Sequence, residues 1–344
     1  MPVSLAPEQL GQTLSRERIV SLLAARGAAQ QALFAAAREV RDTAFGRHAV
    51  VRGVIEVTSA CVKDCHYCPM RVSNRIERYY RQGDELLESA RRVREAGLGI
   101  VAFQGGDVPR TTRTVGEIIP EVRREFGGAV EVLLCLGDKT HDEYAYLRRQ
   151  GADSYILKQE TSDPDLHQAM RGSCLDVRLA AARDLVALGF RLGLGTIVGL
   201  PGQSMASLAD DILLAPALGA RMTSASPFVP AKDTPLADAD AGDIDTTLNV
   251  LAVMRLVNPA ALIPTVSALE TLAPGAQVRG LDAGANIITI NFSPESDQAR
   301  YPIYGQQRFV VRRDHAFRTL EAAGLDPLLG EAASSFWGAE ENRV

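Results

Sequence analysis

Three of the five cysteines lie within eight residues, in the segment Cys61-Val62-Lys63-Asp64-Cys65-His66-Tyr67-Cys68. This segment follows Val51 to Thr58, an apolar and β-branched run that predicts a buried strand. Lys63 and Asp64 within the segment and Pro69 after it are typical of a loop. We therefore expect a loop that directs three sulfur atoms at one centre.

Two kinds of metal centre fit such a loop. A structural zinc ion takes four protein ligands, usually from two pairs of Cys or His, and no second pair follows at finger or ribbon spacing. His66 is a candidate fourth ligand, although it lies between two others on a short loop. An iron-sulfur cluster held by three cysteines leaves one iron without a protein ligand and free to bind a chelating group. A chance group of buried thiols is the remaining alternative.

The loop resembles the cluster-binding motif of radical S-adenosylmethionine (SAM) enzymes. Its spacing is Cys-x3-Cys-x2-Cys, and the aromatic Tyr67 precedes the last cysteine. The resemblance implies that Cys61, Cys65 and Cys68 hold a [4Fe-4S] cluster whose remaining iron is chelated by the amino and carboxylate groups of SAM. It also implies that one electron, from a donor such as flavodoxin or ferredoxin, cleaves SAM to methionine and a 5′-deoxyadenosyl radical.

Composition excludes several other classes of protein. The chain of 344 residues is 46% hydrophobic and 23% charged, as in soluble globular proteins. A net charge of -5 gives no basic footprint for nucleic acid. No apolar run approaches the roughly 18 residues of a membrane span, and the N-terminus lacks a signal peptide's basic start and apolar core. An odd number of cysteines argues against a disulfide framework. We expect a cytoplasmic protein with neither a nucleic-acid nor a membrane partner.

Strand-like and helix-like runs alternate along the chain after residue 50. This alternation predicts a parallel sheet covered by helices. Eight such units close into a (βα)8 TIM barrel, with catalytic groups on the loops after the strands; an open or partial parallel α/β barrel is the alternative. We expect an N-terminal helical cap over residues 1–48, the barrel over 49–330 and a C-terminal tail over 331–344. The expected strands are 51–58, 99–104, 130–136, 154–158, 191–198, 223–228, 262–266 and 286–291.

Polar residues follow several of these strands. In Gly105-Gly106-Asp107 the paired glycines allow close backbone approach to a ligand, and the carboxylate can accept hydrogen bonds from an ammonium group. Period-two alternation places Lys158 and Glu160 on one face, where they either pair with each other or serve a function. Arg178, on the next predicted helix, has a permanent charge that suits a carboxylate.

The family resemblance assigns roles to these residues. Gly105-Gly106-Asp107 is similar to a Gly-Gly-Glu motif that contacts the SAM amino group, with a carboxylate that is one methylene shorter. By the same resemblance Glu160 binds the SAM ribose and Arg178 the SAM carboxylate. Ile197 and the backbone around Tyr67 face the adenine.

An ordered series of shorter motifs resembles one branch of this family, which contains the radical SAM maturase of [FeFe]-hydrogenase, methylornithine synthase and, more distantly, biotin synthase. The series is Arg52-Gly53, Arg78-Tyr79-Tyr80, Glu160-Thr161 with His167, residues 198–203, residues 227–230 with 233–237, Ile263-Pro264-Thr265 and Gly284-Ala285-Asn286. The chain also departs from the branch. It has Lys158 where the maturases have Arg, no cysteine after Cys174 for an accessory cluster, and only Cys135 and Cys174 beyond the motif.

The resemblance implies hydrogen abstraction from a small amino-acid-like or carboxylate-bearing substrate, in a rearrangement, fragmentation or cofactor-forming reaction. Sulfur insertion, metallocofactor maturation and a non-enzymatic cluster-binding scaffold are the alternatives. Lys158 is the first candidate for a substrate contact. Cys135 is either a buried core thiol, which free cysteines commonly are, or a functional one. Thr265 and Ser267 share a predicted strand face, so they either bind a polar substrate or cap the following helix.

Overall fold

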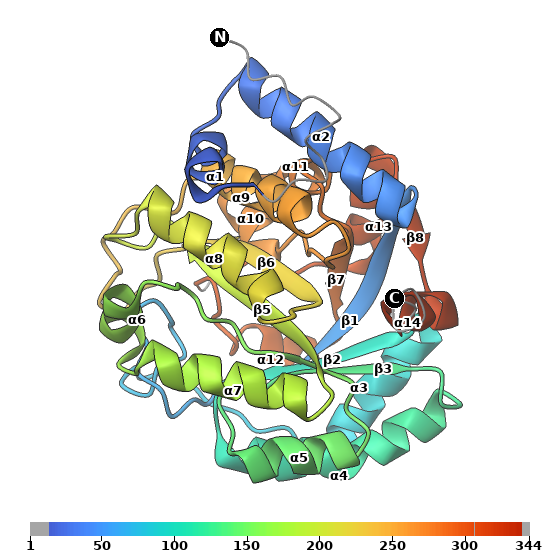
Figure 1. The fold of residues 1–344 in the computed structure, drawn as a ribbon. Coiled ribbons are helices and arrows are strands. Elements are labelled where there is room, and N and C mark those ends of the chain that lie inside the picture. The colour runs from blue at the N-terminus through green and yellow to red at the C-terminus, as the bar shows by residue number, and fades with distance from the viewer. Residues whose placement is uncertain (1–13, 306, 339–344) are drawn as a thin grey trace.

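Seven parallel strands form a curved sheet in the spatial order β6-β5-β4-β3-β2-β1-β7 (Figure 1). The structure is a computed structural model, and it describes residues 14–305 and 307–338. The strands are β1 (His48–Thr58), β2 (Ile100–Gly105), β3 (Glu131–Cys135), β4 (Ser154–Ile156), β5 (Arg191–Val198), β6 (Met222–Pro227) and β7 (Ile287–Asn291). Their sequence positions agree with seven of the predicted strands.

The predicted strand at 262–266 forms only two isolated bridges, one from Leu262 to β6 and one from Pro264 to β7. Pro264 has no N–H group, so this segment cannot build a continuous ladder. The Ile263 N–H is satisfied instead by the Asn286 side chain, whose Oδ1 accepts its hydrogen bond at 2.8 Å. The short segment still joins β6 to β7, and the predicted parallel barrel is confirmed in its partial form.

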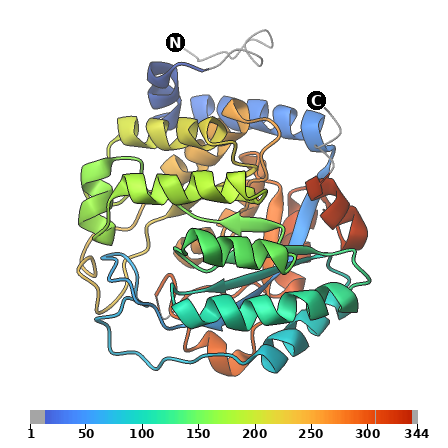
Figure 2. The ribbon, with the colours of Figure 1, turned by 60° about the horizontal axis from the view of Figure 1, so that its bottom comes forward.

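Helices cover the outer face of the sheet (Figures 1 and 2). Thr140 is the N-cap of one of them and forms a capping box, in which the Glu143 side chain accepts a hydrogen bond from the Thr140 N–H. The helices are α1 (Arg16–Leu23), α2 (Ala28–Phe45), α3 (Gly83–Glu95), α4 (Pro109–Glu125), α5 (His141–Arg149), α6 (Pro164–Arg171), α7 (Leu175–Ala187), α8 (Met205–Ala217), α9 (Ile244–Val257), α10 (Ser267–Leu272), α11 (Ala276–Asp282), α12 (Glu295–Gln298), α13 (Arg313–Ala322) and α14 (Gly330–Gly338).

The helix-like run at 270–282 forms two helices, α10 and α11, rather than one. Pro274 and Gly275 separate them. Proline cannot continue the backbone hydrogen bonds of a helix, and Gly275 adopts a φ of 81°, in the left-handed region that glycine tolerates best.

The predicted N-terminal cap lies against the outer helices. α1 packs on α8 and α9, and α2 packs on α9 and leads into β1 (Figure 1). Residues 1–13 of the predicted cap lie outside the described residues. Across the described ranges, no single helix is long and apolar enough to cross a membrane; α1 and α2 pass that test only as a pair bent by 119°.

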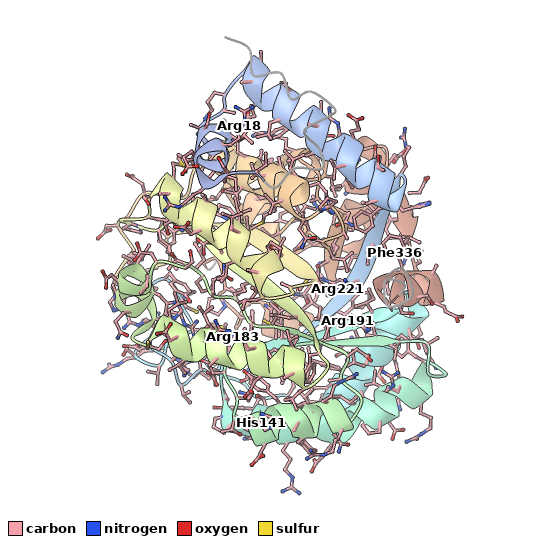
Figure 3. The ribbon with its side chains drawn as sticks, viewed as in Figure 1. Arg18, His141, Arg183, Arg191, Arg221 and Phe336 are labelled. Atoms are coloured by element: carbon pink, nitrogen blue, oxygen red, sulfur yellow. The ribbon has the colours of Figure 1, made fainter. Side chains whose placement is uncertain are left out.

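The C-terminal segment covers the end of the barrel where the strands begin. A short strand, β8 (Asp326–Leu328), pairs with the first residues of β1. Helix α14 runs from Gly330 to Gly338, so this part of the predicted C-terminal tail is helical. Ala333 is fully buried against the core of the barrel, and the Phe336 ring lies 5.3 Å from that of Phe45 (Figure 3). This arrangement leaves the other end of the barrel for the loops that carry the candidate site.

Candidate active site

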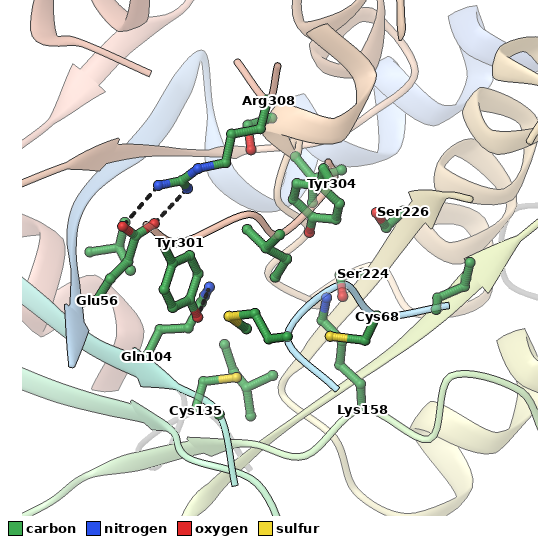
Figure 4. Close-up of a pocket in the computed structure, with 18 of the residues that line it drawn as sticks. Glu56, Cys68, Gln104, Cys135, Lys158, Ser224, Ser226, Tyr301, Tyr304 and Arg308 are labelled. Atoms are coloured by element: carbon green, nitrogen blue, oxygen red, sulfur yellow. Dashed lines mark hydrogen bonds and ion pairs between the residues drawn. The ribbon is translucent and has the colours of Figure 1, made fainter. Parts of the chain in front are cut away.

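A cavity of about 300 Å³ lies inside the barrel and is lined by residues at the ends of the strands and in the loops after them. One side, here called the sulfur wall, carries Cys61, Cys65 and Cys68 together with the residues after β2 and β4. The other side, the strap wall, is formed by residues of β1, β6 and β7 and by a strap, residues 299–305 and 307–312, that follows α12 (Figure 4). The cavity thus lies where a parallel barrel usually places its active site.

Arg78 holds the cysteine loop in its conformation. Its guanidinium group donates hydrogen bonds to four backbone carbonyls at 2.7–3.1 Å, those of Ser59, Met70, Arg71 and Asn74. Arg71 in turn pairs with Asp64 inside the loop at 2.7 Å. Contacts within the protein therefore fix the loop, and all three cysteine side chains line the cavity.

The surroundings of the thiols favour a metal centre. Burial raises the pKa of Cys65, and it raises that of Cys68 to about 12. A thiolate at such a place needs a nearby positive charge, which a metal supplies. Among the described residues, no three Cys, His, Asp or Glu side chains converge closely enough to hold a single ion, and His66 does not line the cavity. A polynuclear cluster does not require such convergence, because each thiolate binds a different iron.

The glycines after β2 bring two backbones together. A Cβ at Gly106 would lie 2.0 Å from the Ala60 carbonyl oxygen and 2.8 Å from Cys61 Cβ, so only glycine fits there. Gly105 lines the same part of the cavity. The close approach places the end of β2 directly beside the first cysteine.

Asp107 and Arg178 are both buried and both engaged in ion pairs. Asp107 lies 3.2 Å from Lys139 and 3.5 Å from Lys63. Arg178 pairs with Asp138, while its Nε is buried and has no hydrogen-bond partner among the described residues. The structure therefore places both predicted SAM contacts at the sulfur wall, with one donor of Arg178 still free.

An apolar patch lies beside these charges. Tyr67 and Ile197 pack in one cluster with Met170, Leu200 and Phe228. Both Tyr67 and Ile197 line the cavity, and a flat apolar ligand such as an adenine ring would be desolvated between them. The adenine contact expected for Ile197 and the backbone around Tyr67 stays a prediction.

Lys158 and Glu160 both line the cavity just beyond the end of β4. They do not pair with each other, and within the described ranges the Lys158 ammonium group makes no hydrogen bond or ion pair. Burial alone lowers the pKa of Lys158, but the neighbouring acidic groups of Tyr304, Glu160 and Cys135 outweigh burial and raise it. Lys158 is therefore charged at neutral pH; the Glu160 carboxylate lies near it, but no carboxylate among the described residues is within ion-pair distance.

Cys135, Thr265 and Ser267 also line the cavity. Cys135 ends β3, and burial raises the pKa of its thiol. The Thr265 hydroxyl donates to the Gln277 carbonyl oxygen at 2.9 Å, so it is already used within the protein. Ser267 is the first residue of α10 rather than part of a strand, and neither it nor Thr265 is the N-cap, which is Val266.

Comparisons with known proteins agree with this geometry. Residues 55–215 match the model of the radical SAM superfamily. The [FeFe] hydrogenase maturase subunit HydE of Thermotoga maritima is 32% identical over 90% of this chain and 89% of its own. The chain belongs to the radical SAM superfamily. It is therefore a radical SAM enzyme, of a family that uses a [4Fe-4S] cluster and SAM.

Two further relatives support the predicted branch. The 3-methylornithine synthase of Methanosarcina barkeri is 28% identical over 86% of this chain and 85% of its own. The crystal structure of methylornithine synthase (PylB) superposes with a TM-score of 0.85 at 25% identity, covering 96% of this chain and 98% of that one. With the more distant biotin synthases, these are the proteins that the motif series resembles.

The residues of the sulfur wall fit the cluster and SAM of a radical SAM enzyme. Three thiols line one cavity, so a [4Fe-4S] cluster held there would keep one iron without a cysteine ligand. The unpartnered Nε of Arg178 and that of Arg171 are buried donors that suit a carboxylate. Cys61, Cys65 and Cys68 would hold the cluster, and the two arginines would hold the carboxylate end of SAM.

Sequence reasoning missed the charged pair of the strap wall. Arg308 of the strap donates to both oxygens of Glu56 in β1, at 2.6 and 2.9 Å, and stacks on Tyr301 at 5.2 Å (Figure 4). The Asn291 side chain also donates to Glu56 at 2.9 Å. A signal was present, because Arg52 and Glu56 interrupt an apolar strand at a period of two and so share one face. Nothing in the sequence indicated that Arg308, 252 residues away, is the partner.

Proposed function

We propose that this radical SAM enzyme abstracts hydrogen from a small carboxylate-bearing or amino-acid-like substrate, in the cytoplasm and with flavodoxin or ferredoxin as electron donor. With SAM bound, the cluster would supply a 5′-deoxyadenosyl radical after one-electron reduction. The observation that carries the proposal is the unpartnered ammonium group of Lys158, which lies in the same cavity as the three cysteines.

The chain makes room for Lys158. A Cβ at Gly195 in β5 would lie 3.1 Å from Lys158 Cγ and 2.3 Å from Ser224 Oγ, so a larger residue there would displace both side chains. Figure 4 shows Lys158 and Ser224 together in the cavity. An ammonium group and a hydroxyl group at one place form a polar site for an anionic group of the substrate.

Arg52 adds a second positive charge to the cavity. Its guanidinium group donates to Thr289 Oγ1 at 2.8 Å and contacts Met222 Sδ at 3.2 Å, but it pairs with no carboxylate among the described residues. Burial lowers the pKa of Arg52 to about 10, which still leaves it charged at neutral pH. Buried cations without counterions are costly, so a negatively charged substrate is the partner that we infer.

The strap provides the closure that radical chemistry needs. A primary carbon radical reacts with whatever lies next to it, so the protein must position the substrate and exclude solvent. The strap crosses the cavity and is tied to β1 by the buried Glu56–Arg308 pair. Opening the cavity from this side requires separation of that pair.

Metallocofactor assembly is a second candidate, favoured by the 32% identity with HydE over 90% of the chain. Sulfur insertion would need a second cluster and cysteines to hold it. Of the two cysteines outside the motif, Cys174 is exposed at the start of α7, and only Cys135 lines the cavity. These alternatives form different products, so product analysis distinguishes them.

The test is anaerobic reconstitution of the cluster, followed by dithionite and SAM. We expect 5′-deoxyadenosine, and we expect its rate of formation to rise with an amino acid or small carboxylic acid that fits the cavity. A reconstituted protein that leaves SAM intact would make the scaffold alternative correct. If an iron complex stimulates SAM cleavage and no amino acid or carboxylic acid does, metallocofactor assembly is favoured.

A further inference from the structure

Glu160 has a backbone conformation that glutamate rarely adopts. Its φ is 66°, in the left-handed region, and Asp233 and Tyr304 are the other described non-glycine residues with positive φ. Such a conformation persists only where the surrounding structure enforces it, and it is commonly found at ligand sites. Here it turns the Glu160 side chain into the cavity directly after β4.

Backbone hydrogen bonds tie Glu160 to β5. The Glu160 N–H donates to the Gly195 carbonyl at 3.0 Å, and the Glu160 carbonyl accepts from the Ile197 N–H at 2.9 Å. The Thr196 hydroxyl lies 2.9 Å from the same carbonyl oxygen. The conformation of Glu160 thus depends on how firmly Thr196 and its neighbours are held.

Asp211 of α8 holds them from behind. Its Oδ1 accepts a hydrogen bond from Gln159 Nε2 at 3.1 Å, and its Oδ2 lies 2.9 Å from Thr196 Oγ1. Gln159 Oε1 in turn accepts from the Gly195 N–H at 3.1 Å. One carboxylate therefore connects the residue before Glu160 with the strand to which Glu160 is bound.

This carboxylate has no cation to neutralise it. Asp211 is 1% exposed, and its partners among the described residues are uncharged donors: Gln159, Thr196 and Ser162. Burial raises its pKa to about 7, and these hydrogen bonds act in the opposite direction. Burying a carboxylate without a cation costs free energy, so we expect Asp211 to have a function that offsets this cost. Asp211 does not line the cavity, so direct contact with a ligand is not that function.

We propose that Asp211 is a positioning residue, which fixes the Glu160 carboxylate for the ribose of SAM through Gln159 and Thr196. The inference rests on the proposed role of Glu160 in SAM binding. It adds a determinant of SAM affinity that lies outside every family motif quoted above. Asp211 acts on the cofactor only through Glu160, and this gives the inference a specific test.

The substitution is Asp211→Asn, and the matched control is Asp210→Asn. Asparagine keeps the shape but removes the negative charge. Its NH2 group can donate to the Thr196 hydroxyl, so both hydrogen bonds can form, but they lose the strength that an ionised acceptor gives them. Asp210 is the preceding residue of α8, where it is exposed and pairs with Arg16 on the protein surface. The ligand is S-adenosylhomocysteine, and its Kd for the reconstituted, unreduced protein is measured by calorimetry at pH 8, where the Asp211 carboxylate is ionised.

We expect Asp211→Asn to raise this Kd about tenfold, and Asp210→Asn to change it less than about twofold. In a Glu160→Ala background, Asp211→Asn should have no further effect, because Glu160 transmits the change. An equal effect of Asp211→Asn in both backgrounds would overturn the inference, since a general loss of structure does not depend on Glu160. An unchanged Kd in Asp211→Asn would also overturn it.

The same measurements distinguish failure of the proposed Glu160 role from failure of the proposed Asp211 role. If Glu160→Ala leaves the Kd unchanged, Glu160 does not bind the ribose, and the inference about Asp211 fails as well. If Asp211→Asn does not fold, Thr196→Val removes one of the same hydrogen bonds at nearly constant volume. It should raise the Kd about threefold, and only when Glu160 is present. An unchanged Kd in Thr196→Val would contradict the inference equally.

Discussion

The two walls of the cavity are built in different ways. The sulfur wall takes its thiols from one stretch of eight residues, and its other groups come from the loops after β2 and β4. The strap wall joins Glu56 of β1 to Arg308, which are 252 residues apart. The first wall carries the cysteine motif that the family shares, and the second adds the Glu56–Arg308 pair, which belongs to none of the family motifs. We infer that the sulfur wall determines the kind of chemistry and the strap wall determines the substrate.

Removal of a cysteine from the sulfur wall should have the largest effect. Cys65→Ala leaves two thiols for the cluster, so we expect loss of bound iron and no detectable cleavage of SAM. Iron analysis and chromatography of 5′-deoxyadenosine measure the two losses. Cys174→Ala is the control, because Cys174 is exposed and does not line the cavity. Full iron content and activity in Cys65→Ala would mean that the metal centre lies elsewhere.

The contrast between the walls also explains what the sequence could predict. Cys61, Cys65 and Cys68 were predictable because ligands close in sequence must be close in space. Lys158 and Glu160 were predictable because they follow a strand of the parallel sheet, although β4 ends at Ile156 and Glu160 reaches the cavity through its left-handed backbone rather than through strand alternation. Arg308 was not, because it lies on a strap without regular secondary structure, and its partner is known only once the barrel has closed. Asp211 was hidden for another reason: it is one of two adjacent acids on a mostly apolar helix, and either looks like a surface residue until its burial is known.

The same contrast explains the errors in the fold. The segment at 262–266 has the apolar residues of a strand, but Pro264 removes a donor, and the Asn286 side chain replaces part of the ladder. β8 was missed because it is short and contains Pro327, and because it adds to the first residues of β1 rather than to the barrel. Local patterns thus predict which segments become strands, while the pairing partners decide how long each strand is.

Lys158 follows β4 on the sulfur wall and lies near Ser224 of the strap wall, and its removal should affect the substrate more than SAM. Lys158→Met keeps most of the side-chain volume and removes the charge. We expect the KM for the substrate to rise about a hundredfold, because a hydrogen bond to a charged group is lost. The Kd for S-adenosylhomocysteine should change less than about twofold. Lys232→Met, at an exposed position, is the control. An equal loss of affinity for both ligands would contradict the division between the walls.

Opening the strap wall should uncouple SAM cleavage from substrate turnover. Arg308→Gln breaks the buried pair and leaves the Glu56 carboxylate without its cation, which should also destabilise the protein by about 3 kcal/mol. We expect about ten times more 5′-deoxyadenosine per product formed, because the substrate is held less firmly. Product ratios and thermal unfolding measure the two effects. Arg312→Gln is the control, since Arg312 is exposed and pairs with the exposed Glu295. Unchanged coupling in Arg308→Gln would show that the strap does not close the site.

Cys135→Ser should have the smallest effect, and it is the most direct test of whether the cavity holds another cluster. Cys135 is the one cysteine beyond the motif that lines the cavity, and Cys174 is on the outer surface. A second cluster would need several thiolates there, and the described residues offer one. We therefore expect about four iron and four sulfide ions per chain in both the parent protein and Cys135→Ser, and turnover within about threefold. A higher iron content that falls to about four in Cys135→Ser would place a second cluster in the cavity. The cavity would then supply a reactant, rather than only hold one.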